Sequence, residues 1–79
     1  MLVPLYGFLR GDTIGLLVLV HDHQKVSAIA AALQRAAAIR VPVSPLAKVY
    51  ARGRLLDPEL SIAAAGLTAL ERVDVIGEG

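Results

Sequence analysis

The sequence contains no cysteine, no long apolar run and no large excess of either charge. Without cysteine the chain can form neither a disulfide nor a thiolate metal site, which fits a reducing compartment. The longest apolar run, residues 14–20, falls far short of the roughly twenty residues that a membrane-spanning helix needs. Pro4, Arg10 and Asp12 interrupt the start of the chain before a signal-like apolar segment forms. We therefore expect a cytoplasmic protein that does not bind a membrane.

Charge and hydrophobicity indicate what kind of partner to expect. Eight basic and seven acidic residues give a net charge of +1, and no basic stripe is present. This argues against nucleic-acid binding, which depends on clustered positive charge. The chain is 56% hydrophobic, and a small domain this apolar often covers part of its surface with a protein partner.

The length of 79 residues fits one domain, 1–79, with a short tail at residues 76–79. A domain of this size buries roughly 60% of the surface of its unfolded chain, so its core is small.

The longest predicted element is a helix over residues 26–39. Five residues recur at helical spacing and predict one apolar face: Val26, Ile29, Ala30, Leu33 and Ala37. Ser27, Gln34 and Arg35 fall outside this stripe. Asp22 is the expected N-terminal cap, and the helix should end before Pro42, because a residue that precedes proline avoids the helical conformation.

A hairpin is predicted before the helix, with strands over residues 2–9 and 14–20 around a turn at residues 10–13. Pro4 cannot donate a ladder hydrogen bond, so at that residue the first strand should lie at an edge or at its beginning. Both faces of the second strand are apolar. Ile14, Leu16, Val18 and Val20 lie on one face, which can pack against the helix. The other face, with Gly15, Leu17 and Leu19, is then left for solvent or for a partner.

The second half of the chain predicts the remaining strands. Residues 47–52 alternate, with Ala47, Val49 and Ala51 on one side. Residues 54–56 form a short strand, residues 61–65 a helical turn that Gly66 ends, and residues 73–76 the last strand. The prediction is an α+β fold with a mixed sheet of four to five strands packed on one helix. The last strand should lie between the first and third strands.

Two short motifs suggest a metal site or a recognition motif, but an ordinary role in a loop or turn explains each of them better. His21 and His23 form an H-x-H pair, yet no further histidine or cysteine exists to complete a zinc site. Arg10-Gly11-Asp12 matches the integrin-recognition tripeptide, but glycine and aspartate are expected in a hairpin turn. The sequence offers no phosphate-binding loop, nucleophile motif or paired carboxylates. We therefore predict no active site, no metal and no cofactor.

The element order and several segments resemble ubiquitin and its β-grasp fold. Residues 11–14 match the first hairpin, residues 49–57 match a strand-turn-strand with a glycine and a basic-any-Leu step, and residues 60–67 match the short turn that follows. The fold serves modifiers, sulfur carriers and docking subunits alike, so the fold alone does not fix the function.

Within this superfamily the chain is similar to the small B (gamma) subunit of toluene monooxygenase hydroxylases. The residues that carry this likeness include Pro4, the doubly apolar run 16–20, Arg40-Val41, and residues 60–67 and 73–76. The resemblance implies a non-catalytic subunit, in aromatic hydrocarbon catabolism, bound to larger alpha- and beta-type subunits. In such complexes the diiron centre belongs to the alpha subunit.

Two alternatives remain open from the sequence. One is a free-standing ubiquitin-like interaction module with another protein partner. The other is a sulfur carrier or modifier, whose chemistry needs a terminal Gly-Gly. Here Glu78 stands between Gly77 and Gly79, which argues against that chemistry.

Two surfaces are candidates for binding a partner. The first is the outer face of the hairpin, with Leu17 and Leu19. The second follows from the resemblance, because ubiquitin binds partners through an apolar patch on the open face of its sheet. The matching positions are Leu9, Tyr50 and Ile76, with Arg52 and Arg54 at the rim. Tyrosine and arginine are frequent anchors of protein interfaces.

Overall fold

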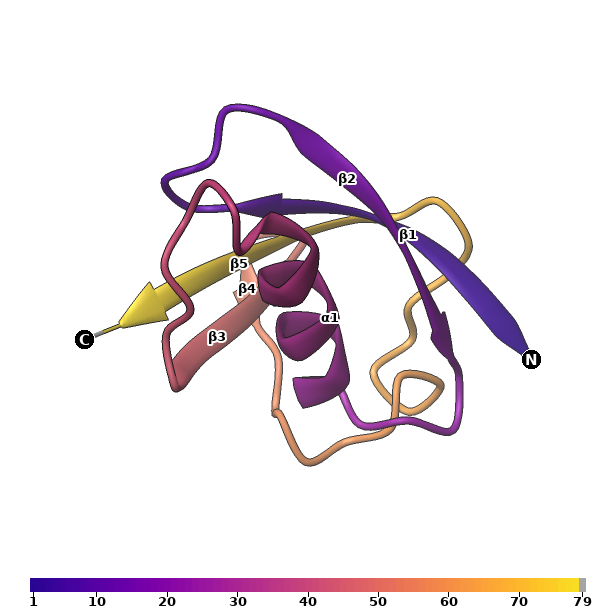
Figure 1. The fold of residues 1–79 in the computed structure, drawn as a ribbon. Coiled ribbons are helices and arrows are strands. Elements are labelled where there is room, and N and C mark those ends of the chain that lie inside the picture. Colours follow the sequence, from indigo (N-terminus) through magenta and orange to yellow (C-terminus); the bar gives the residue numbers. More distant parts are fainter. Residues whose placement is uncertain (79) are drawn as a thin grey trace.

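A computed structural model describes residues 1–78 and shows one helix packed across one face of a five-stranded sheet (Figure 1). The elements in chain order are β1 (Leu2–Leu9), β2 (Gly15–His21), α1 (Ser27–Ala37), β3 (Leu46–Ala51), β4 (Arg54–Leu55) and β5 (Arg72–Glu78).

The strand order across the sheet is β2-β1-β5-β3-β4. The β1 and β5 strands are parallel, and the other neighbours are antiparallel. The last strand therefore lies between the first and the third, which confirms the predicted arrangement. The Pro4 prediction is also confirmed. The pairing of β5 with β1 begins only at Tyr6. At Pro4, β1 therefore has no β5 neighbour on that side, and no ladder hydrogen bond is lost because proline lacks an N–H.

The core lies between α1 and the inner face of the sheet. All five residues predicted for the apolar stripe of the helix are buried. They pack against alternate residues of the strands, including Leu5 of β1, Val18 of β2, Val49 of β3 and Val75 of β5. Because side chains alternate across a strand, the residues between these positions point to the outer face.

The helix differs from its prediction in three respects. It is shorter, and the chain turns after Ala37 through hydrogen bonds from Arg40 and Val41 to the Ala37 carbonyl. Asp22 does not cap it, because its carboxylate accepts a hydrogen bond from the N-terminal amine at 2.9 Å. Gln34, which falls outside the predicted apolar stripe, is nevertheless buried, and its side chain is hydrogen-bonded to the Ser44 backbone.

The last strand is longer than predicted. Gly77 and Glu78 were expected in the tail, but they pair with Ala47 and Leu46 of β3. Gly79 lies outside the described residues. The helical turn over residues 61–65 forms as predicted, with a hydrogen bond from the Ala65 N–H to the Ser61 carbonyl.

Candidate partner-binding surface

The outer face of the sheet, on the side away from α1, is apolar over β1 and β2. We define the apolar outer patch as Leu2, Pro4, Tyr6, Leu17 and Leu19. The register places Tyr6 opposite Leu17 and Pro4 opposite Leu19. Leu17 and Leu19 are 56% and 59% exposed, and Leu2 and Tyr6 are about half exposed. The structure thus brings the two leucines predicted from the sequence together with three β1 residues.

The β1 members of this patch were missed by the sequence analysis. The first strand is apolar almost throughout, so its inward and outward positions could not be told apart. In the structure Val3, Leu5 and Leu9 are buried, which turns Leu2 and Tyr6 outward.

The same alternation shows that the prediction for Leu9 was wrong. Leu9 is 4% exposed and belongs to the core. The residue that faces outward at this end of β1 is its neighbour Phe8, which is half-buried. A displacement of one residue along a strand exchanges the two faces of the sheet.

Beside the apolar outer patch, Phe8 is enclosed by two residues from neighbouring strands. The Arg72 guanidinium carbon lies 4.1 Å from the centroid of the Phe8 ring, a cation–π contact. The same arginine donates to Asp74 at 3.0 Å. On the other side, the ring lies so close to Gly15 that a Cβ there would be 2.6 Å from it.

Tyr50 and Ile76 lie on the outer face as predicted, but on the β3–β5 side of the sheet. Tyr50 pairs with Asp74 and Ile76 pairs with Lys48, and both apolar side chains are half-buried. The charged residues Arg72 and Asp74 of β5 lie between them and the apolar outer patch. The outer face therefore has an apolar half and a mixed half.

The two arginines predicted at the rim do not act as a pair. Arg52 forms an ion pair with Glu71 at 2.7 Å and donates to the Gly66 carbonyl at 3.3 Å. Arg54 is opposite the buried Ala51 in the register, so it lies on the inner face of the sheet. There it is at the margin of the core and exposed to solvent. Arg52 and Gly53 form the two-residue hairpin loop between β3 and β4. Both have positive φ, as type I′ turns require.

The structure shows the surroundings of the two short motifs of the sequence. The rings of His21 and His23 lie 5.2 Å apart between centroids. Among the side chains of residues 1–77, no group of three or more His, Cys, Asp or Glu is placed to hold a metal ion. The aspartate of Arg10-Gly11-Asp12 has a side chain only 2% exposed, because Arg40 binds both of its oxygens. That carboxylate is not available to a partner.

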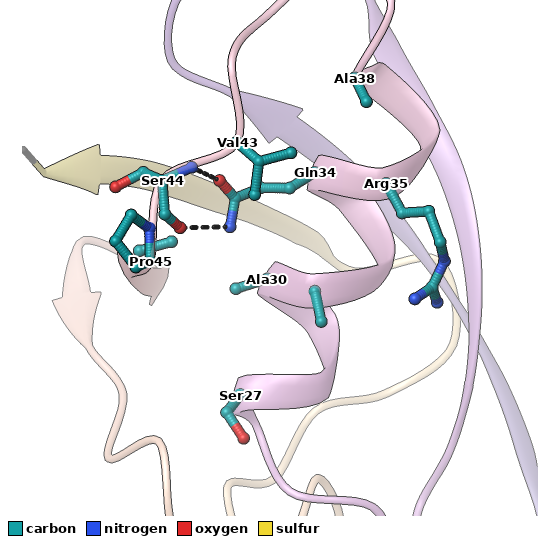
Figure 2. Close-up of a pocket in the computed structure, with 10 residues that line it drawn as sticks. Ser27, Ala30, Gln34, Arg35, Ala38, Val43, Ser44 and Pro45 are labelled. Carbon is teal, nitrogen blue, oxygen red and sulfur yellow. Dashed lines mark hydrogen bonds between the residues drawn. The ribbon is translucent and has the colours of Figure 1, made fainter.

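A pocket lies between α1 and the loop before β3, away from the apolar outer patch, and Figure 2 shows the side chains that line it. Gln34 extends from the helix and exchanges two hydrogen bonds with the Ser44 backbone, as donor at 3.1 Å and as acceptor at 2.6 Å. These bonds explain why a polar residue is buried here. The lining is otherwise dominated by small side chains such as Ala30, Ala31 and Ala38.

Solved structures with this architecture come from several sources. A chain of the toluene 4-monooxygenase HD complex with the inhibitor 4-bromobenzoate superposes with a TM-score of 0.88 at 22% identity, covering 99% of this chain and 100% of that one. Ubiquitin of Caldiarchaeum subterraneum matches with a TM-score of 0.79 at 14% identity, covering 100% and 96%. A ubiquitin-like domain of an Arabidopsis thaliana protein matches with a TM-score of 0.76 at 15% identity, covering 99% and 79%. No curated protein sequence matches significantly.

These likenesses and the strand order define a ubiquitin-like β-grasp domain of the α+β class. Residues 2–76 also match the family model of toluene-4-monooxygenase system protein B, so the chain belongs to that family. In the described part of the chain, no helix is both long and apolar enough to cross a membrane.

Proposed function

We propose that this chain is a non-catalytic small subunit of a toluene-monooxygenase-type hydroxylase, and that its apolar outer patch docks onto a larger, alpha- or beta-type subunit. Family membership and the full-length match to a chain of the toluene 4-monooxygenase complex support this assignment. We also keep the expectation from the sequence that the complex is cytoplasmic.

The observation that carries the proposal is the exposure of large apolar side chains on one side of the sheet. Leu2, Tyr6, Leu17 and Leu19 are each about half exposed and lie on adjacent strands. Antiparallel sheets often leave one face in water, but that face is then mostly polar. Removing apolar surface from water yields about 25 cal/mol per Å², which favours a covered patch.

The chemistry of the remaining side chains supports a non-catalytic role. Among residues 1–78, Asp12, Asp22, Glu59 and Glu71 are engaged in ion pairs with Arg40, the N-terminal amine, Lys25 and Arg52. Such carboxylates stabilise the domain and are poorly placed to move protons to or from a substrate.

The test is co-purification with the larger hydroxylase subunits after co-expression. We expect the Leu17→Asp/Leu19→Asp variant to fail to co-purify, because two charges would be buried in an apolar interface. Val43→Asp is the matched control, since Val43 is similarly exposed, at 61%, but lies on the loop between α1 and β3. Circular dichroism of the isolated variants checks their folding. Co-purification of a folded double variant at the wild-type level would contradict the proposal.

A further inference from the structure

The β2 strand forms an open edge of the sheet. It is seven residues long and pairs with β1 alone, whereas the opposite edge, β4, has only two residues. The β2 sequence, GLLVLVH, contains no proline, lysine, arginine or carboxylate. Long edge strands normally carry such residues, because an unprotected edge pairs with other chains.

Two hydrogen bonds of β1 show which β2 residues direct their backbone toward this open edge. Tyr6 is opposite Leu17, yet the Tyr6 N–H donates to the Glu71 carbonyl at 3.0 Å, away from β2. Pro4 is opposite Leu19, and its carbonyl accepts from the Leu70 N–H at 2.6 Å, again away from β2. Both pairs are therefore non-hydrogen-bonded pairs of the antiparallel ladder.

It follows that the N–H and C=O groups of Leu17 and Leu19 point away from β1, out of the sheet edge. In the part of the chain that the structure describes, no group donates to or accepts from them. The next residue of this set, His21, is satisfied locally, because its N–H donates to Gln24 Oε1 at 2.7 Å and its carbonyl accepts from the Gln24 N–H at 3.0 Å. The open donors and acceptors therefore stop before the His21 end of the strand.

We infer that a strand of the larger subunit pairs with the open edge of β2 through the backbone of Leu17 and Leu19. This inference rests on the proposed function and adds the mode of docking. Each of the two residues offers one N–H donor and one C=O acceptor, and the two residues are about 7 Å apart along the strand. Alternate residues of one extended partner segment have the same spacing. The side chains of the same residues lie in the apolar outer patch, so the added segment should alternate, with apolar residues on its outer face.

A larger partner explains this surface better than a second copy of the chain. Two copies joined edge to edge would form one continuous sheet, whose outer side chains all point in the same direction. Leu2, Tyr6, Leu17 and Leu19 of both copies would then remain exposed. A larger subunit can supply a strand for the edge and also an element that covers the face.

Amide hydrogen exchange on the assembled complex tests the inference. Exchange is carried out on the intact complex, quenched at low pH and read in the peptides that contain β2, with the isolated chain as control. We expect the Leu17 and Leu19 amides to slow by about tenfold or more on assembly, the effect of one added backbone hydrogen bond. Unchanged exchange in a complex that forms would overturn the strand pairing and leave the proposed function standing.

Two further results separate the ways in which the inference can fail. If the complex does not form at all, the proposed function fails and the inference fails with it. If the isolated chain shows protection of these amides that rises with its own concentration, a second copy occupies the edge and the assignment to a larger subunit is wrong.

A pair of variants separates the backbone from the side chain at one position. Leu19→Ala removes the side chain and keeps the N–H, whereas Leu19→Pro also removes the outward N–H, which an edge strand tolerates. We expect the proline variant to weaken association about tenfold more than the alanine variant. Equal affinities of the two variants, both folded by circular dichroism, would overturn the inference.

Discussion

Arg40 and Asp12 join the end of the helix to the turn of the first hairpin. The guanidinium donates to both carboxylate oxygens, with Nε to Oδ1 at 3.0 Å and Nη2 to Oδ2 at 2.8 Å. The Asp12 carboxylate also accepts the N–H of Thr13 at 2.8 Å. A paired, two-pronged arrangement of this kind fixes the relative orientation of the two segments.

This pair predicts how stability depends on pH. The hydrogen bond from Arg40 is the main reason why the pKa of Asp12 is lowered, and desolvation opposes it. A carboxyl group whose pKa is lower in the folded chain stabilises it above the unfolded pKa of about 3.9, and loses that contribution as the pH falls through the folded value. We therefore expect stability to fall below about pH 4, measured by urea unfolding at several pH values.

Variants assign this pH dependence to the pair. Asp12→Asn should be less stable than the wild type at pH 7 and should lose less stability between pH 5 and pH 3. The Asp22 carboxyl, whose pKa is lowered chiefly by the N-terminal amine, contributes in the same direction and remains in the variant. Arg40→Gln should reproduce the effect of Asp12→Asn. An unchanged pH profile in both variants would show that the pair does not determine the acid response.

Gly15 is predicted to be required by the ring of Phe8. An alanine Cβ at this position would lie 2.6 Å from the ring, so the ring must move and its contact with Arg72 must weaken. Overpacking of this kind typically costs about 1–3 kcal/mol. We expect Gly15→Ala to lower the free energy of urea unfolding by about that amount. In a Phe8→Leu background the same substitution should cost much less, and an equal cost in both backgrounds would contradict the assignment.

Gln34 is predicted to hold the loop before β3 against the helix. Gln34→Leu keeps the approximate volume but removes both hydrogen bonds to the Ser44 backbone. Removing one partner of a buried hydrogen bond costs about 1–3 kcal/mol. The adjacent exposed residue gives the control, since Arg35→Ala should change stability by no more than about 0.5 kcal/mol. Equal effects of the two substitutions on urea unfolding would count against this role.

Gly53 is predicted to be required by the backbone alone. Its φ is +74°, and a Cβ there would meet nothing within 4 Å. Gly53→Ala should therefore cost about 1–2 kcal/mol through the left-handed conformation only. Gly53→Asn should cost less, because asparagine tolerates this conformation. A denaturation midpoint that is the same for alanine and asparagine would refute the argument.

Much of the fold could be predicted because local pattern and global packing agree. The helical spacing from Val26 to Ala37 and the alternation of Ala47, Val49 and Ala51 each identify the buried face of one element. The position of the last strand followed from the need to cover the helix. Residues whose environment comes from another element were harder to predict. Asp22 pairs with the N-terminus and Gln34 with the Ser44 backbone, and neither contact leaves a local signal.

The candidate surface was predicted only where the strand pattern is clear. Leu17 and Leu19 could be identified because the alternate residues of β2 pack against the helix. The prediction for Leu9 rests on the resemblance to ubiquitin. Because the first strand is apolar almost throughout, its sequence does not show which residues face inward, and so does not reveal that Leu9 is buried. The backbone direction at Leu17 follows from the hydrogen bond between Tyr6 and Glu71, two residues far apart in sequence.

The central claim is that the apolar outer patch faces a larger subunit in the assembled hydroxylase. The most direct measurement is photo-crosslinking from a photoreactive side chain placed at position 19 in the assembled complex, compared with the same group at position 43. The account predicts a crosslink to a larger subunit from position 19 and little or none from position 43. A crosslink from position 43 with none from position 19 would contradict it.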